Sequence, residues 1–108
     1  MIIVNIAKDF TRYPSGRYKR NGSTSGEEFR DRFLKEPISK RQQVTVDFDG
    51  TVGYGSSFLE EAFGGLVRSV RIPSDEILAL LTLKSSDESI CDEVKVYIKE
   101  AGARVTHA

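Results

Sequence analysis

The feature that most constrains this chain is the junction at residues 44–65, VTVDFDGTVGYGSSFLEEAFGG, where a strand pattern passes through a glycine-rich loop into a helix pattern. Val44, Val46 and Phe48 alternate with polar residues, which is the period of a β-strand with two different faces. From Ser57 the apolar residues recur at helical spacing instead. Functional residues of α/β folds tend to lie where strand ends meet helix starts, so we expect them at this junction.

Strand and helix patterns elsewhere predict the rest of the fold. Apolar runs indicate strands at residues 2–6 and 77–83, and a turn signal at residues 13–16 predicts a hairpin that returns along residues 17–20. The first predicted helix is capped by Ser25, with Glu28 three residues later, and stops at Pro37. A second helix begins at Ser57. A third is capped by Ser86 and ends at Gly102, and a last edge strand follows at residues 103–106.

These elements give the order β-β-α-β-α-β-α-β. The predicted fold is α/β, with a mixed, mostly parallel sheet of four to five strands and about three packed helices. The chain has 108 residues, of which 39% are hydrophobic, and this suits a single domain over residues 1–108.

Composition argues against several classes of function. No apolar run reaches the length of a membrane span, and the first residues lack the basic region of a signal peptide, so we expect a cytoplasmic protein with no membrane partner. The single cysteine, Cys91, is expected in the core, and with one histidine, His107, no zinc cluster forms; we expect no metal and no cofactor. Basic and acidic residues both number 16, which argues against general nucleic-acid binding.

The loop between strand and helix suits an anion or a modified side chain. Gly50, Gly53 and Gly55 let the backbone turn with few side chains in the way, and backbone N–H groups at a helix start attract negative charge. Ser57, followed three residues later by Glu60, fits a capping box. The hydroxyl of Ser56 has no such role and could accept a phosphoryl group.

Two alternatives compete with a regulatory role. The first is a phosphatase, because VTVDFDGTV resembles the first motif of haloacid-dehalogenase phosphatases. This resemblance implies a magnesium-dependent enzyme with Asp47 as nucleophile and Asp49 as general acid/base. Thr82 and Lys84 could supply the later motifs of that family, but its downstream acidic pair is missing. The second alternative is a nucleic-acid or toxin–antitoxin accessory protein that binds through the basic, tyrosine-containing segment 17–20.

A second resemblance spans most of the chain. Its blocks are Ser15-Gly16-Arg17-Tyr18, Ser25-Gly26 with Glu28-Phe29-Arg30, Val46-Asp47-Phe48-Asp49-Gly50, and residues 55–64, GSSFLEEAFG. In this order the blocks resemble the bacterial family of STAS-like domains of unknown function, which is related to the STAS domains of anti-sigma factor antagonists. In those domains a serine at a helix start is phosphorylated by a partner kinase of the GHKL ATPase type. The resemblance places Ser56 at that position and Ser57 next to it.

The sequence therefore predicts a non-enzymatic, protein-binding signalling module. We expect phosphorylation at Ser56 or Ser57, no catalytic residue, and a partner that is a GHKL-type kinase or an anti-sigma-like factor. A weak homodimer could form through an exposed first or last strand. The expected partner-binding residues are Asp49, Gly53, Tyr54, Gly55, Ser56, Phe58 and Glu61.

Overall fold

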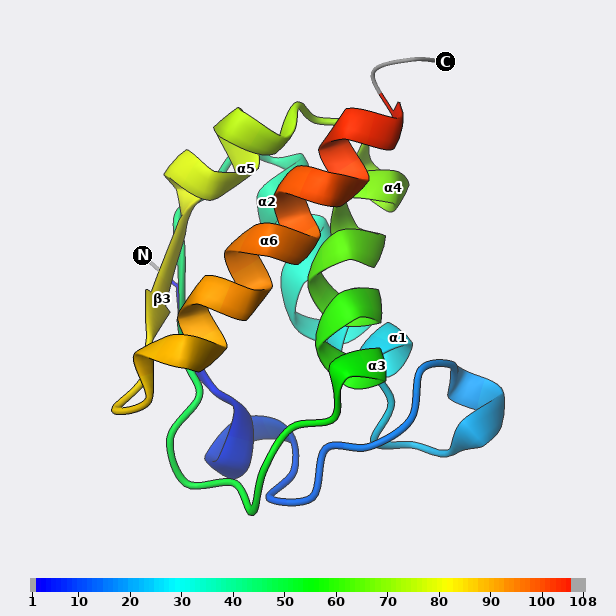
Figure 1. The fold of residues 1–108 in the computed structure, drawn as a ribbon, viewed down its shortest axis with the longest axis vertical. Helices are drawn as coiled ribbons and strands as arrows, with labels where there is room; N and C mark the ends of the chain where they lie inside the picture. The colour runs from blue at the N-terminus through cyan, green and yellow to red at the C-terminus, as the bar shows by residue number, and fades with distance from the viewer. Residues whose placement is uncertain (1, 106–108) are drawn as a thin grey trace.

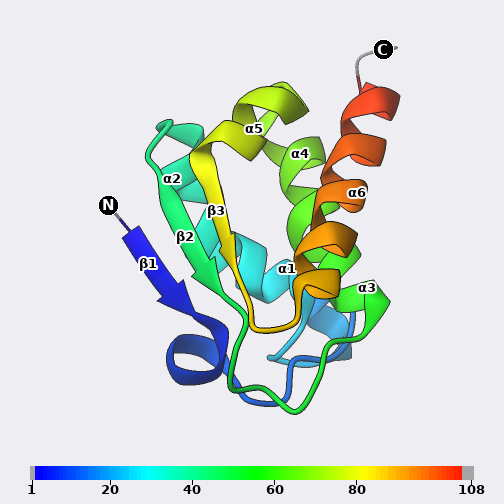
Figure 2. The same ribbon diagram turned by 60° about the vertical axis from the view of Figure 1, so that its left-hand side comes forward.

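The computed structural model describes residues 2–105, and it shows a parallel sheet with helices on one side (Figure 2). The strands are β1 (Ile2–Asn5), β2 (Val44–Asp47) and β3 (Leu81–Lys84), in that spatial order. The α-helical segments are α1 (Gly26–Phe29), α2 (Lys35–Ser39), α3 (Ser56–Leu59), α4 (Gly65–Val70), α5 (Ser74–Leu80) and α6 (Glu88–Val105). Segments Ile6–Phe10, Arg30–Leu34 and Glu60–Gly64 are π-helical, and Lys19–Asn21 is a 3-10 turn.

Two long helices are each built from three of these segments. α1, Arg30–Leu34 and α2 follow one another without a break and form one helix over residues 26–39. α3, Glu60–Gly64 and α4 form a second helix over residues 56–70. α6 lies alongside the 56–70 helix (Figure 1). The predicted helices at these three places are confirmed, but the first does not stop at Pro37 as expected, because it continues through this residue to Ser39.

The two faces of the sheet differ because the helices cover one of them. Val4, Val46 and Leu83 lie in register across the sheet, and the first two are buried on the helix side. On the other face the register row is Ile3, Thr45 and Thr82, of which Ile3 and Thr82 are exposed. The alternation predicted for the strand at residue 44 is therefore confirmed, and a side chain's face decides its burial.

The predicted hairpin at residues 13–20 does not form. The side chain of Asn5 accepts a hydrogen bond from the Lys8 N–H, and Asp9 accepts one from the Asn5 N–H, both at 2.8 Å. These local bonds turn the chain into the π-helical segment Ile6–Phe10 and away from a second strand. The chain beyond it closes onto the start of α1, where the N–H of Gly26 donates to the carbonyl of Gly16 at 3.0 Å.

The strand predicted at residues 77–83 is shorter than expected. Residues 74–80 form α5, and only Leu81–Lys84 is strand. Pro73 at the cap position, with Asp75 and Glu76 in the first turn, supplies helix-start signals that outweigh the apolar run that follows.

The last predicted strand is also wrong over its described part. α6 continues through Gly102 to residue 105, and Thr106 lies outside the described residues. Gly102 serves close packing here, since a Cβ on it would lie 2.4 Å from the hydroxyl oxygen of Ser74 at the start of α5. The class of fold and its parallel core are as predicted, with three strands in residues 2–105 where four to five were expected.

Candidate functional site

The 56–70 helix begins with two exposed serines. Gly55 is the cap residue, in an extended conformation, and has no side chain with which to bond the first turn. Ser56 and Ser57 are the first two helical residues and both are exposed. The predicted capping box between Ser57 and Glu60 is wrong, because the cap lies two residues earlier and Glu60 bonds to arginines instead. Among residues 2–105, neither serine hydroxyl has a hydrogen-bond partner.

Tyr54 anchors the loop before this helix to the end of β2. Its hydroxyl donates to the carbonyl oxygen of Phe48 at 2.7 Å, and the two rings meet edge to face with centroids 5.5 Å apart. Burial raises the pKa of the Tyr54 hydroxyl to about 12. Gly53 has φ +151°, a conformation that other residues rarely adopt. Tyr54 is thus an anchor under the loop, while Val52 is 68% exposed on its outer side.

Asp49 lies inside the junction and is engaged there. One of its carboxylate oxygens accepts hydrogen bonds from the Ser86 N–H at 2.9 Å, the Ser86 hydroxyl at 3.0 Å and the Ser85 hydroxyl at 3.5 Å. These bonds, led by the one from the Ser86 backbone, lower the pKa of Asp49. Ser86 therefore does not cap α6 as predicted; it joins the end of β3 to the loop after β2.

The two aspartates of the phosphatase alternative bond within the protein. Asp47 accepts a hydrogen bond from the Asp49 N–H at 3.0 Å, and Asp49 is used by Ser85 and Ser86. Within the described part of the chain, no three His, Cys, Asp or Glu side chains gather in a way that could hold a metal ion. Both carboxylates thus help to shape the loop.

Phe58 and Glu61 are not part of the exposed surface. Phe58 is fully buried, with its ring centroid 6.0 Å from that of Phe29 and 6.5 Å from that of Phe10. Glu61 is 7% exposed, and its carboxylate accepts a hydrogen bond from Arg30 Nη1 at 2.6 Å. Both face the 26–39 helix, so their predicted role in partner binding is corrected to a role in packing the two long helices together.

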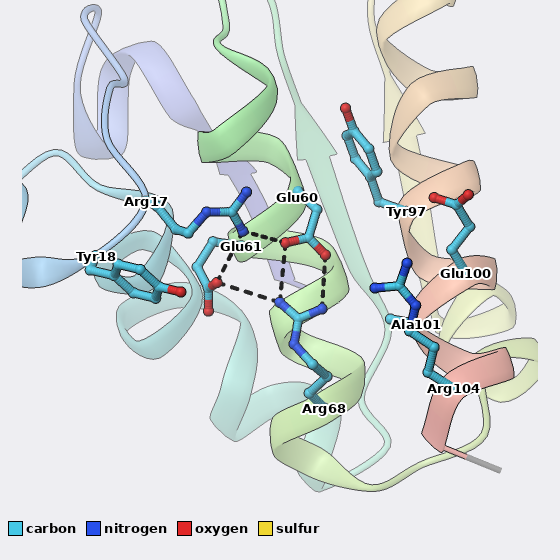
Figure 3. Close-up of a pocket in the computed structure, with 9 residues that line it drawn as sticks. All are labelled: Arg17, Tyr18, Glu60, Glu61, Arg68, Tyr97, Glu100, Ala101 and Arg104. Carbon is cyan, nitrogen blue, oxygen red and sulfur yellow. Dashed lines mark hydrogen bonds and ion pairs between the residues drawn. The ribbon is translucent and has the colours of Figure 1, made fainter. Parts of the chain in front are cut away.

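An Arg–Glu cluster, which the sequence did not predict, lies one turn beyond the serines. Arg17 Nη1 lies 2.5 Å from Glu60 Oε1 and 3.4 Å from Glu61 Oε1. Arg68 bonds Glu60 through both terminal nitrogens, at 2.8 and 3.2 Å, and lies 3.4 Å from Glu61 (Figure 3). The Arg–Glu cluster comprises Arg17, Arg30, Glu60, Glu61 and Arg68. Glu60 pairs with two arginines of this cluster, and Glu61 pairs with three.

Charge pairing sets the protonation of this cluster. The hydrogen bond from Arg68 is the main cause that lowers the pKa of Glu60, and the bond from Arg17 acts in the same direction. Glu60 in turn raises the pKa of both Arg17 and Arg68. Glu60, Arg17 and Arg68 are therefore charged near neutral pH and form ion pairs with one another.

The glycine pair in the helix makes room for the cluster. A Cβ at Gly64 would lie 2.4 Å from a carboxylate oxygen of Glu60. A Cβ at Gly65 would lie 2.7 Å from both Arg30 Nη1 and Glu61 Oε2. Each glycine follows its glutamate by four residues, so the pattern EE-x-x-GG in the sequence is the signal that could have revealed these paired carboxylates.

A polar cavity of about 610 Å³ opens between the Arg–Glu cluster and α6 (Figure 3). From the α6 side it is lined by Tyr97, Glu100, Ala101 and Arg104. The hydroxyl of Tyr97 donates to Glu93 at 2.6 Å, and this bond is the main cause that raises the Tyr97 pKa to about 12. The cavity walls thus carry charges of both signs.

The basic segment 17–20 is mostly committed to internal contacts. Arg17 belongs to the Arg–Glu cluster, and Lys19 pairs with Asp31 at 2.8 Å. The Arg20 guanidinium lies 4.8 Å from the centre of the Tyr18 ring. Two of the three cations proposed to contact phosphate backbone, Arg17 and Lys19, therefore already pair with carboxylates.

The two remaining sequence predictions concern Cys91 and His107. Cys91 was expected in the core, but it is only half-buried and is not one of the core residues. Its thiol is free, and burial is the main cause that raises its pKa. His107 lies outside the described residues. No helix in residues 2–105 combines the length and the apolar character needed to cross a bilayer.

Together, the exposed residues at the helix start form one surface, which we call the serine rim: Val52, Gly53, Gly55, Ser56 and Ser57. The structure is thus a small α/β module with a hydroxyl-bearing rim at one end of its sheet. A family model described as a STAS-like domain of unknown function matches residues 25–91. Because the match covers more than half of the chain, the chain belongs to this family. No curated protein and no solved structure matches it.

Proposed function

We propose that this protein is a regulatory binding module that docks on a protein partner through the serine rim and has no catalytic activity of its own. The observation that carries the proposal is the pair of exposed hydroxyls at the start of the 56–70 helix, which do nothing for the helix itself. Val52 adds an exposed apolar side chain beside them. The rim thus offers one apolar contact and two hydroxyl groups, and protein interfaces combine apolar area with hydrogen bonds.

Phosphorylation of Ser56 would control the docking. A partner kinase of the GHKL ATPase type transfers the γ-phosphoryl group of ATP to the Ser56 hydroxyl oxygen, which releases ADP and a proton. The modified residue carries a charge of about −1.5 to −2 at neutral pH. The first backbone N–H groups of the helix have no acceptor within it and can stabilise that charge, whereas a partner fitted to a neutral hydroxyl would have to desolvate it. Phosphorylation therefore releases the partner.

The proposal is tested by mixing the protein with a candidate GHKL-type kinase or anti-sigma-like factor and ATP. We expect mass spectrometry to locate phosphate on Ser56, and calorimetry to show binding of the unmodified protein. Ser56→Asp should weaken that binding at least about tenfold, a loss of about 1.4 kcal/mol.

A matched control is Ser39→Asp, which places the same charge on an exposed serine at the end of the 26–39 helix. It should leave the affinity unchanged. If both substitutions weakened binding equally, the loss of affinity would depend only on the total charge of the protein, and this result would contradict the proposed switch at Ser56. Phosphate found only on serines outside the rim would do the same.

A further inference from the structure

Arg17 reaches the start of the 56–70 helix from a distant part of the chain. Ser56 and Glu60 are four residues apart and so share one face of the helix. The Glu60 carboxylate leans away from Ser56, toward Gly64, where a Cβ would lie 2.4 Å from one of its oxygens. Arg68 bonds it from the carboxyl-terminal side, which leaves Arg17 on the side of the helix start. Arg17 Nη1 lies 2.5 Å from that carboxylate, and Figure 3 shows Arg17 beside the turn that begins this helix.

The guanidinium of Arg17 is only partly used. Its two bonds to carboxylates both come from Nη1, and its side chain remains 32% exposed. In the described part of the chain, Nη2 and Nε have no acceptor. A guanidinium presents paired N–H groups that match two oxygens of a phosphate, so the unused edge of Arg17 is suited to a phosphoryl group.

We propose that Arg17 binds the phosphoryl group on Ser56 and releases Glu60, so that phosphorylation exchanges one ion pair within the protein for another. This inference rests on the proposed phosphorylation of Ser56. Arg17 binds the phosphoryl group in preference to Glu60, because the phosphoryl group carries a larger negative charge than a carboxylate and offers three acceptor oxygens.

The neighbours of Arg17 permit this exchange at little cost. Glu60 keeps its two hydrogen bonds from Arg68, so it does not become an unpaired carboxylate. The backbone at Arg17 is anchored, since its carbonyl accepts the Glu27 N–H at 3.0 Å. Only the side chain of Arg17 has to turn. The Arg–Glu cluster, which holds the two long helices together, thereby loses one of its contacts when the rim is modified.

The test uses the full chain with phosphoserine incorporated at position 56 during translation, and it requires neither a kinase nor a partner. The pKa of the phosphoserine is measured by ³¹P NMR titration in the otherwise unchanged protein and in Arg17→Gln. A phosphoserine titrates near pH 6, and a bound guanidinium favours the dianion. We expect Arg17→Gln to raise the phosphoserine pKa by about half a unit or more, and Arg17→Lys, which keeps the charge, to raise it less.

The matched control is Arg41→Gln, which also removes an arginine paired with a glutamate, here Glu76, outside the cluster. It should leave the phosphoserine pKa unchanged. Equal pKa values with and without Arg17, or equal effects of Arg17→Gln and Arg41→Gln, would overturn the proposal. So would an Arg17-dependent shift that appears only with phosphoserine at position 57. Loss of partner control with this titration intact would reject the proposed function and leave the Arg17 contact standing.

Discussion

The two long helices begin in opposite ways. The 26–39 helix starts with Ser25-Gly26, in which Ser25 is the cap residue and its buried hydroxyl accepts the Glu28 N–H at 3.1 Å. The 56–70 helix starts with Gly55-Ser56, in which glycine is the cap residue and the serine hydroxyl faces solvent. The order of the same two residue types decides whether the hydroxyl stabilises the helix or stays available for another molecule.

The two glycines differ as much as the two serines. Gly26 lies against the other long helix, where a Cβ on it would approach the carbonyl oxygen of Phe58 to 2.4 Å and the Ala62 nitrogen to 3.1 Å. A Cβ on Gly55 would meet nothing within 4 Å. The start of the 26–39 helix is therefore packed against the other long helix, and the start of the 56–70 helix is exposed to solvent.

The largest effect is expected from Gly26→Ala. The added methyl group overlaps the backbone of the 56–70 helix, which cannot move aside without disturbing Glu61, so we expect a loss of about 2–3 kcal/mol of unfolding free energy. Urea denaturation measures it. Gly55→Ala is the control and should cost at most about 1 kcal/mol, because alanine is a poorer cap residue than glycine but meets no neighbouring atom there. Similar losses from both substitutions would contradict the contrast between the helix starts.

A smaller loss is expected from Ser25→Ala. It removes the cap bond and leaves the Glu28 N–H without its acceptor, at a cost of about 1–2 kcal/mol. Ser57→Ala should be within about 0.5 kcal/mol of the unchanged protein, because its hydroxyl is exposed. A destabilisation by Ser57→Ala as large as that by Ser25→Ala would show that the serine rim stabilises its helix after all.

Acid should weaken the second helix through Glu60. Its pKa is lower in the folded protein than the ordinary value of 4.5, with the Arg68 hydrogen bond as main cause. The ionised form therefore stabilises the fold fully above about pH 4.5, and this contribution is lost as pH falls through the folded-state pKa. Unfolding free energies between pH 6 and pH 3 should fall less steeply in Glu60→Gln. Parallel curves would mean that the ion pairs of Glu60 add nothing to stability.

The smallest effect is expected from Ser56→Asp on stability. A carboxylate in the first turn of a helix gains about 0.3–1 kcal/mol at low ionic strength. The gain should shrink in high salt, because this interaction is exposed and screened. Thermal unfolding at two salt concentrations measures both. A clear destabilisation by Ser56→Asp at low salt would show that the rim cannot carry the negative charge that phosphorylation brings.

Local patterns predicted the parts of this fold whose bonds are local. The alternation from Val44 and the cap at Ser25 both depend on residues close in sequence, and both were found. Local bonds also produced a failure, since Asn5 and Asp9 turn the chain where a hairpin was expected. At the candidate site the sequence located the exposed Ser56. It could not show that Glu60 pairs with Arg17, because the two lie 43 residues apart and only the fold brings them together.

The bonds from Ser85 and Ser86 to Asp49 fix how the loops after β2 and β3 lie relative to each other. Tyr54 fixes the same region from beneath through Phe48. A surface built on such a frame is already ordered, so the proposed association there would lose little conformational entropy and would involve no coupled folding. Under the proposed docking, affinity at this end of the molecule would be tuned by exchanging outward side chains such as Val52, with the backbone beneath them left as it is.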